Sequence, residues 1–394
     1  MSMTQLPEPR RLLLLGGGHA HVAVLKAFEK APIGGLTVVL VSRQPLTPYS
    51  GMVPGCISGR YSEREAHLDL VCLSARAGVE FVQGEVKGLD LPFKEVLLDT
   101  GQRIPFDLLS VNTGSTPDIT SVPCAKMFVT PIKPIDRFLV EWNRFLSAVV
   151  EPQKPVPVRI AVVGGGAGGI ELAVAIHERS NRDLAEGRRR GVDQPISTTI
   201  IHAGNQILPT HGVFVRSTMA RALKEIGIQL QLGQSVIRVR ERELELANGQ
   251  CLTFDKIFWA TQASAPHWIK DSGIATDDRG FIAVNETLQS VSSPEVFGAG
   301  DVVSMAPTPC PKAGVYAVRQ GPILAENLRR FVLQRPLLSY QPQRRFLSLI
   351  TAGRGTVIAS WGPFAARGKW LAHLKHRIDK QWMHQYCLSP KDGY

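Results

Sequence analysis

The sequence predicts an α/β fold in which parallel strands alternate with helices in two similar units, followed by a basic region of mixed helix and strand. Two observations carry this prediction. A short apolar run followed by a glycine-rich turn occurs twice, at residues 12–21 and 160–169, and a nine-residue segment recurs at the same offset. With 44% hydrophobic and 20% charged residues among 394, the chain has the composition of a globular protein of two or three domains.

Composition also excludes several classes of protein. No apolar run approaches the roughly 18 residues that a membrane-spanning helix needs. The six cysteines form no CxxC pair and have no metal-ligand spacing, so we expect free thiols in a cytoplasmic protein and no metal site. The net charge of +11 is concentrated in residues 326–394, which hold 12 Lys or Arg and 3 Asp or Glu. We expect an anionic lipid surface or an acidic protein as the neighbour of this region, and no nucleic acid.

The two glycine-rich turns have the pattern of a nucleotide-binding strand–turn–helix unit. The first is GGGHAH at residues 16–21, and the second is GGGAGG at residues 164–169. In such a unit the first glycine permits the turn, the second lets the backbone approach a pyrophosphate, and the helix N-terminus supplies N–H donors. One such turn is a weak indicator, but two in one chain predict two Rossmann-like dinucleotide-binding domains.

The recurring segment has the pattern of a β-hairpin. DTGQRIPFD at residues 99–107 is echoed by ANGQCLTFD at residues 247–255, which is the offset of 148 positions that also separates Gly16 from Gly164. Each copy leads into a short apolar strand and a turn that contains threonine. We therefore expect an internal duplication.

A third distinctive stretch follows the second unit. Residues 296–301, VFGAGD, form an apolar strand that ends in Gly-Asp, and a helix is expected from Ala313 to about Arg330. Doubly wound sheets bind their ligands at the carboxyl edge of the strands, so Asp301 can bind a polyol there.

These landmarks, in this order over residues 10–330, resemble the flavoprotein superfamily of the pyridine nucleotide-disulfide oxidoreductases and, more closely, the type II NADH:quinone oxidoreductases. The segments YSGMVPG at 49–55 and PKAGVYAVRQG at 311–321, with the Trp-rich tail, look still more like the flavoprotein half found fused to selenophosphate synthetase (selenide, water dikinase). The resemblance implies a glutathione-reductase-like arrangement. Its parts would be a discontinuous FAD-binding domain at 10–130 and 266–330, an NAD(P)H-binding domain at 131–265, and a basic α+β C-terminal region at 331–394.

The resemblance also implies which residues bind the cofactors. Those facing FAD would be Gly16, Gly18 and His19 at the pyrophosphate, Thr113 and Gly114 beside it, Gly300 and Asp301 at the ribitol, and Lys312 and Ala313 at the start of a helix that faces the pyrimidine edge. Gly164, Gly166 and Gly169 would meet the pyrophosphate of NAD(P)H.

The implied activity is that of an FAD-dependent NAD(P)H dehydrogenase of the type II kind. Hydride would pass from NAD(P)H to FAD, and electrons would then pass to a quinone or another small-molecule acceptor, without proton pumping. Glu171 matches the family glutamate near the nicotinamide, and Gln320 is expected near the acceptor, so these two are the predicted catalytic residues. Two alternatives stay open: an FAD-dependent oxidoreductase with a sulfide or selenium donor, and a flavin-bearing adaptor in selenium metabolism.

Three positions depart from the family pattern. His21 stands where the first turn should have its third glycine, which predicts looser packing of helix on strand. The second strand of the first unit ends in Arg43 where an acid usually binds a ribose. The corresponding position of the second unit is His202, which leaves NADH and NADPH both open.

Residues 365–386 combine aromatic and basic residues at helical spacing. The apolar set is Trp370, Leu371, Leu374, Ile378, Trp382 and Tyr386, and cations fall largely elsewhere around the helix. The pattern fits a helix on an anionic membrane surface, and equally a helix that packs on the body or on another subunit. We thus expect a cytoplasmic protein for which peripheral binding to the inner face of a membrane, and a homodimer, are both open.

Overall fold

Two parallel sheets form the centre of the molecule, in a computed structural model that describes residues 5–150, 158–188, 196–306 and 308–387. The first sheet has the strand order β21-β9-β1-β2-β5, with β1 (Gln5–Leu15), β2 (Gly34–Ser42), β5 (Glu80–Gln83), β9 (Leu108–Val111) and β21 (Val296–Gly298). The second has the order β11-β18-β12-β13-β14, with β11 (Thr130–Pro131), β12 (Val158–Val163), β13 (Ile196–His202), β14 (Gln229–Leu232) and β18 (Lys256–Trp259). The predicted α/β fold with two Rossmann-like units is confirmed.

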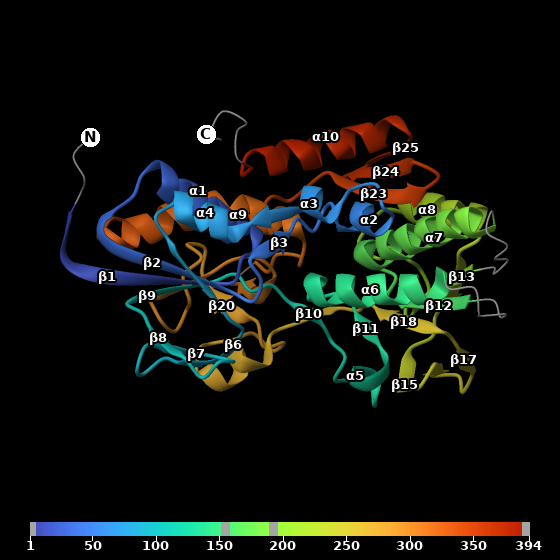
Figure 1. Ribbon diagram of the computed structural model, residues 1–394, viewed down its shortest axis with the longest axis horizontal. Helices are drawn as coiled ribbons and strands as arrows, with labels where there is room; N and C mark the ends of the chain where they lie inside the picture. Colours follow the sequence, from blue (N-terminus) through green and yellow to red (C-terminus); the bar gives the residue numbers. More distant parts are fainter. Residues whose placement is uncertain (1–4, 151–157, 189–195, 307, 388–394) are drawn as a thin grey trace.

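Helices cover one face of the first sheet and a small antiparallel sheet, described below, covers the other, which explains why the central strand is apolar throughout. Residues 12–15 of β1 are four consecutive leucines, and all four are fully buried, as expected for a strand covered on both faces. The helices α1 (His19–Lys30) and α9 (Gly314–Val332) pack closely because Gly321 has no side chain: a Cβ there would lie 2.7 Å from that of Ala23. The short α4 (Leu70–Arg76) lies beside α1 (Figure 1).

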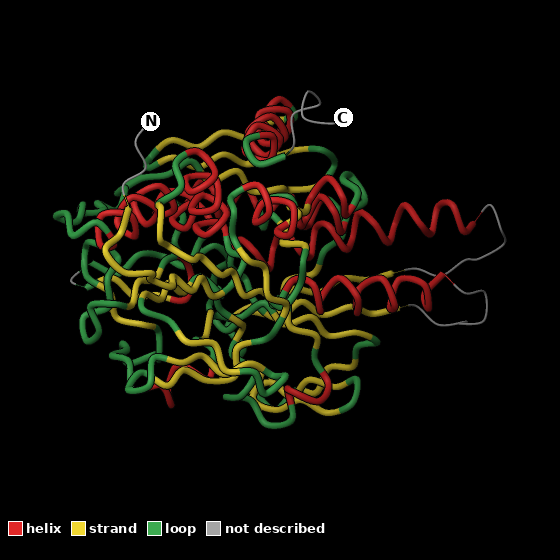
Figure 2. Tube along the Cα trace, turned by 60° about the vertical axis from the view of Figure 1, so that its left-hand side comes forward, coloured by secondary structure: helices red, strands yellow, loops and turns green. Residues whose placement is uncertain are grey.

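The second sheet is covered in the same way, with three helices on one face. These are α6 (Ile135–Val150), α7 (Ala167–Arg188) and α8 (Val213–Glu225). The aromatic rings of Phe138 and Trp142 on α6 pack edge-on against Phe258 of β18, with ring centres 5.5 and 6.0 Å apart. The two helices α6 and α7 lie side by side and project from the body (Figure 2).

Each unit carries a three-stranded antiparallel sheet that contains the repeated segment. In the first unit it consists of β6 (Val86–Asp90), β7 (Glu95–Leu98) and β8 (Arg103–Pro105), and in the second of β15 (Val236–Arg240), β16 (Glu243–Leu246) and β17 (Cys251–Thr253). The turns match as well, since Gly101 and Gly249 have φ angles of +83° and +82°. The predicted hairpin is therefore present twice.

The C-terminal region folds as a small antiparallel sheet covered by one helix. The strands are β23 (Ser348–Gly353), β24 (Thr356–Trp361) and β25 (Phe364–Gly368), and the helix is α10 (Trp370–His384) (Figure 1). Residues 388–394 of the predicted region lie outside the described residues. No helix within the described ranges is both long and apolar enough to cross a membrane.

The apolar stripe predicted for α10 is only partly buried. Leu371, Trp382 and Tyr386 are buried against the body, whereas Trp370 and Ile378 are 62% and 40% exposed. Packing on the body, one of the two predicted alternatives, therefore accounts for half of the stripe.

Short elements complete the chain. They are β3 (Leu46–Pro48), α2 (Val53–Ile57), α3 (Glu63–Ala66), β4 (His67–Asp69), β10 (Thr116–Pro117), α5 (Ala125–Phe128), β19 (Ala263–Ser264), η1 (His267–Ser272), β20 (Ile282–Val284), η2 (Gly300–Val302) and β22 (Val303–Met305).

Candidate active site

A large cleft opens at the carboxyl ends of β1 and β9. Its volume is about 920 Å³, which suits a ligand of cofactor size. Four of the segments that form its wall are the glycine-rich turn at 16–19, the end of β2 at 41–44, the loop after β9 at 112–118, and the segment 133–138 that leads into α6. No cysteine occurs among the described residues that line the cleft.

The first glycine-rich turn presses against the loop after β9. A Cβ on Gly16, whose φ is +91°, would lie 2.7 Å from the carbonyl oxygen of Asn112, and one on Gly18 would lie 2.2 Å from the Asn112 side-chain oxygen. That oxygen accepts hydrogen bonds from the backbone N–H groups of Ala20 and His21, at 3.1 and 3.3 Å. Only glycine permits this approach, so the backbone itself faces the cleft.

His21 takes the place of the third glycine and ties the turn to the sheet. Its Nδ1 lies 2.6 Å from the carbonyl oxygen of Gly16, and its Nε2 lies 2.9 Å from the hydroxyl of Ser110. Burial lowers the pKa of His21 to about 4, so the ring is neutral at pH 7. The expected looser packing does not occur, because the imidazole fills the space and satisfies both polar groups.

Thr113 and Gly114 continue the wall of the cleft. The Thr113 hydroxyl is buried and has no hydrogen-bond partner among the described residues. A buried hydroxyl without a partner costs free energy, so its place on the wall favours a polar ligand that bonds to it. This hydroxyl and the exposed backbone of the turn fit the polyol and pyrophosphate of a flavin dinucleotide.

Asp301 lies just after β21, as predicted. Its Oδ2 is 2.6 Å from the Nζ of Lys133 and accepts a hydrogen bond from the hydroxyl of Ser115 at 3.4 Å. Burial alone would raise the pKa of Asp301, but the positive charges of Lys133 and Lys312 outweigh it and leave this pKa below its ordinary value. The carboxylate is therefore ionised at neutral pH and can accept hydrogen bonds from hydroxyl groups.

Gln320 lies beneath the loop that carries Asp301. Its side chain is buried, and its Oε1 accepts a hydrogen bond from the N–H of Gly300 at 2.7 Å. Gly300 has a φ of +76°, so the loop turns sharply at that point. The structure thus places Gln320 in the core as a support of this loop, and not at a surface that is open to an acceptor.

Lys312 and Ala313 precede α9, as predicted. The Lys312 ammonium donates to the carbonyl oxygen of Val303 and lies 3.7 Å from the centre of the Phe281 ring. Burial lowers the pKa of Lys312 to about 8. This cation therefore stays mostly protonated at pH 7 beside the first turn of α9.

His19, at the start of α1, faces the C-terminal region. Its ring centre is 5.3 Å from that of Tyr49 and 5.2 Å from that of Trp382 on α10. Burial lowers its pKa to about 4, so the ring is neutral at pH 7. An aromatic cluster thereby connects α10 with the cleft.

The second glycine-rich turn is held by backbone contacts. A Cβ on Gly164 would lie 2.2 Å from the carbonyl oxygen of Ala260, and one on Gly169 would lie 2.2 Å from that of Gly164. Gly166, between them, borders open space. Its amide neighbourhood is therefore free of side chains that would block a pyrophosphate.

His202 ends β13, the position where an acid usually binds a ribose. Its Nδ1 accepts a hydrogen bond from the N–H of Gly165 at 3.3 Å. Burial lowers its pKa below the ordinary value, so the ring is neutral at pH 7. A neutral imidazole offers neither the carboxylate that selects NADH nor the positive charge that selects NADPH.

Glu171, on α7, is held by the C-terminal region. Its Oε1 accepts hydrogen bonds from the N–H and the hydroxyl of Thr351 on β23, at 3.0 and 3.1 Å. The Nζ of Lys375 on α10 lies 3.4 Å from the same oxygen. The predicted catalytic glutamate therefore lies where the second unit meets the C-terminal region.

Asp379 lies one turn further along α10 and is also buried. Burial raises its pKa to about 6, with the charge of Glu171 adding to this and that of Lys375 opposing it. Burial and the Asp379 carboxylate raise the pKa of Tyr49, whose ring stacks on Trp382 with centres 4.2 Å apart. Two carboxylates and one ammonium thus form a buried acid–base cluster, which Tyr49 and His19 connect to the cleft.

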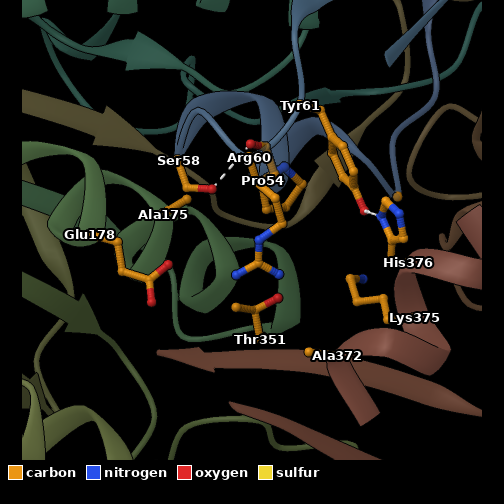
Figure 3. A pocket seen from close by; sticks show the side chains of 12 residues that line it. Pro54, Ser58, Arg60, Tyr61, Ala175, Glu178, Thr351, Ala372, Lys375 and His376 are labelled. Atoms are coloured by element: carbon orange, nitrogen blue, oxygen red, sulfur yellow. Dashed lines mark hydrogen bonds between the residues drawn. The ribbon is translucent and has the colours of Figure 1, made fainter. Parts of the chain in front are cut away.

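A small cavity of about 20 Å³ adjoins this cluster (Figure 3). It lies among α2, α7, β23 and α10, and Lys375 and Thr351 form part of its wall. The Tyr61 hydroxyl and the Nδ1 of His376, 2.7 Å apart, form the side that Figure 3 shows opposite Glu178. The cavity has room for about one water molecule beside Lys375.

Four residues of the site escaped the sequence analysis. Asn112 follows β9 directly before the predicted Thr113, so its position could have revealed it. Lys133, Lys375 and Asp379 reach the site from segments that are distant in the sequence, and no local pattern marks them.

Comparisons with known proteins agree with this geometry. A family model described as pyridine nucleotide-disulphide oxidoreductase matches residues 10–321. Demethylphylloquinone reductase NdbB of Synechocystis sp. is 25% identical over 96% of this chain and 94% of its own length. Type II NADH:quinone oxidoreductase Ndh of Mycobacterium tuberculosis is 25% identical over 94% of this chain and 84% of its own length.

Solved structures share the fold. NDH2 from Plasmodium falciparum, in complex with NADH, has a TM-score of 0.80 at 15% identity and covers 96% of this chain and 99% of its own. The sulfide:quinone oxidoreductase of Aquifex aeolicus has a TM-score of 0.75 at 18% identity, with coverage of 96% and 91%. Because the family model matches most of its length, the chain belongs to the pyridine nucleotide-disulphide oxidoreductase family, and it is an oxidoreductase that uses FAD with NAD(P)H as its substrate.

Proposed function

We propose that this protein transfers electrons from NAD(P)H through FAD to a quinone. The observation that carries the proposal is a buried acid–base cluster that contacts the cleft through Tyr49 and His19, while no cysteine lines the cleft among the described residues. A dithiol mechanism needs a cysteine pair beside the flavin, so electrons must leave to a diffusible acceptor. The matched relatives named as quinone reductases support a quinone in that position.

Each unit has a separate task in this proposal. The first unit binds FAD through residues 16–19, 113–114, 300–301 and 312–313, and the second binds NAD(P)H through Gly164, Gly166 and Gly169. In domain terms, residues 10–130 and 266–330 hold FAD, and residues 131–265 hold the nicotinamide nucleotide. Residues 331–394 form the acceptor side, which is the side of the site where the quinone would bind. Bound FAD supplies the two-electron chemistry, taking up hydride and releasing electrons to the acceptor.

The chain's own residues supply binding and protons. Reduction of a quinone to a quinol takes up two protons as well as two electrons. Glu171, Lys375 and Asp379 lie together at the acceptor side, and a carboxyl with a pKa of about 6 can exchange a proton near neutral pH. The small cavity beside Lys375 has room for a water molecule that can return protons to this cluster. Gln320 acts as a positioning residue for the loop of Asp301.

A membrane surface is part of the proposal because quinones are lipid-soluble. Trp370 and Ile378 are exposed on α10, and Lys369 and Arg377 are exposed beside them. Exposed aromatic and basic side chains on one helix favour peripheral binding to an anionic leaflet. Flotation with anionic vesicles would decrease in a Trp370→Ser/Ile378→Ser variant, and unchanged flotation would exclude this face as the anchor.

Anaerobic stopped-flow spectroscopy tests the electron pathway. We expect NADH or NADPH to bleach the flavin absorbance, and a water-soluble quinone to restore it. A Glu171→Gln variant would hold its flavin normally but lower quinone turnover by about 10-fold or more. Glu186→Gln, an exposed change on the same helix, is the matched control. Absence of bleaching with both nucleotides would contradict the proposal.

A further inference from the structure

The first unit lacks the acid that usually binds a ribose, although its fold leaves a place for one. Arg43 follows β2, and residues 41–44 line the cleft together with residues 84–87. Because the pyrophosphate lies at the turn after β1, the adenosine half of FAD extends over the end of the neighbouring strand β2. The adenosine ribose of FAD is therefore expected beside Arg43.

A carboxylate reaches this place from another part of the chain. The Arg43 Nε donates to the Asp136 Oδ2 at 3.1 Å, and a second guanidinium nitrogen bonds to the Oδ1 of the same carboxylate. Asp136 lies in the first turn of α6 and lines the cleft, as Arg43 does. Paired bonds of this kind fix the orientation of a carboxylate, and about two of its four acceptor positions stay free.

We propose that Asp136, held by Arg43, binds the adenosine ribose of FAD in place of the missing acid. The two ribose hydroxyls donate to the free acceptor positions of the carboxylate. The guanidinium compensates its negative charge, so that the carboxylate does not repel the nearby pyrophosphate. The inference rests on binding of FAD by this family and is independent of the electron acceptor.

Two further ion pairs hold Asp136 in place. Lys133 pairs with Asp301 at 2.6 Å, and Arg137 pairs with Glu85 at 2.9 Å, so residues 133–137 are tied to the first unit on both sides of Asp136. Glu85 also lines the cleft and is the rival acid. Its partners Arg137 and Lys87, the latter at 3.3 Å, are 61% and 51% exposed, so they fix Glu85 less firmly than the paired bonds of Arg43 fix Asp136.

The test uses the full-length protein loaded with FAD or with an FAD analogue that lacks the 2′-hydroxyl of the adenosine ribose. Loss of protein-bound flavin absorbance during ultrafiltration gives the release rate of each cofactor. We expect wild type to release the deoxy analogue about 10-fold faster than FAD, since a hydrogen bond to a charged group is lost. Asp136→Asn would release FAD about 10-fold faster and would no longer distinguish the two cofactors.

Two control variants separate a ribose contact from a general loosening of the site. Glu29→Gln breaks a pair of similar exposure, Arg76–Glu29, away from the cleft and should change neither rate. Glu85→Gln should leave the discrimination between the cofactors intact. Arg43→Lys, which keeps the charge but not the paired bonds, should reduce the discrimination, and it serves as the second variant if Asp136→Asn does not fold.

Three results would overturn the inference. If wild type releases FAD and the deoxy analogue at the same rate, no contact to the 2′-hydroxyl exists. This result would not depend on any variant. If Asp136→Asn accelerates the release of both cofactors equally, Asp136 only holds the two units together. Loss of discrimination in Glu85→Gln, with Asp136→Asn unchanged, would assign the ribose to the rival acid.

Discussion

Three polar side chains hold the first glycine-rich turn, whereas the second is held mainly by backbone contacts, with His202 as the one side chain described as bonding to it. His21, Ser110 and Asn112 form the polar set around the first turn, with hydrogen bonds to the turn and to α1. At the offset of 148 positions the second unit has Gly169, Phe258 and Ala260 instead. Three polar side chains therefore support the turn in the first copy, whereas glycine and apolar residues stand at the same three positions in the second.

This difference matches what each turn has to bind. In the first unit, Asn112 and His21 fix the turn before any ligand arrives, which suits a cofactor that stays bound. In the second unit, open space borders Gly166, which suits a substrate that binds and leaves in every cycle. Two copies of one motif have thus diverged in how firmly they are fixed.

The strongest test of this difference between the two turns is to add one methyl group to the second turn. In Gly164→Ala the new Cβ would lie 2.2 Å from the carbonyl oxygen of Ala260, on a backbone with a φ of +134°. We expect a cost of about 3 kcal/mol or more in unfolding free energy and loss of flavin bleaching by NADH, while FAD stays bound. Calorimetry and flavin absorbance measure the two effects. Simultaneous loss of FAD would mean that the units are not independent.

His21→Ala tests whether the polar side chains hold the first turn. It leaves a cavity and removes the partners of Gly16 and Ser110, so we expect destabilisation by about 3 kcal/mol and faster release of FAD. Urea denaturation measures the first effect. His384→Ala, an exposed change on α10, is the control. A glycine at position 21 should not restore stability, because the first unit lacks the close packing of the second.

The same histidine predicts a dependence of stability on pH. Its pKa is about 4 in the folded protein and 6.5 when unperturbed, so below pH 6.5 the unfolded chain takes up a proton that the folded protein does not. The unfolding free energy should therefore fall as the pH drops from 6.5 to 4, by up to about 3 kcal/mol from this group. His21→Gln should weaken this fall. An identical pH profile in wild type and variant would exclude His21 as its source.

Ser110→Ala gives the smallest effect. Only one hydrogen bond, from the hydroxyl to the Nε2 of His21, is lost from the first unit. We expect a cost of about 1 kcal/mol in urea denaturation, without a change in release of FAD. An effect as large as that of His21→Ala would instead indicate that the whole polar set acts as one unit.

Local pattern was enough to predict much of the fold. The turns at Gly16 and Gly164, the repeated hairpins and the strand before Asp301 depend on glycine, on apolar runs and on short spacings, all of which are visible in a sequence. Close approach of backbones needs glycine whatever surrounds it, and this is why the turns could be found.

Contacts between distant segments escaped the prediction. Asp136 meets Arg43 across 93 positions, and Lys375 meets Glu171 from a different element, so neither pairing has a local signal. The stripe on α10 shows a further limit: helical spacing marked Leu371 and Ile378 alike, but only the shape of the body decided which of them became buried.

The partners of Glu171 come from β23 and α10, and its hydrogen bond to Thr351 spans 180 positions. During synthesis both glycine-rich turns leave the ribosome long before these segments do. The newly made chain can thus assemble a place for each nucleotide while its acceptor side is still open to solvent. Because both partners of Glu171 are made last, the order of the segments leaves this carboxylate without Thr351 and Lys375 until β23 and α10 have folded.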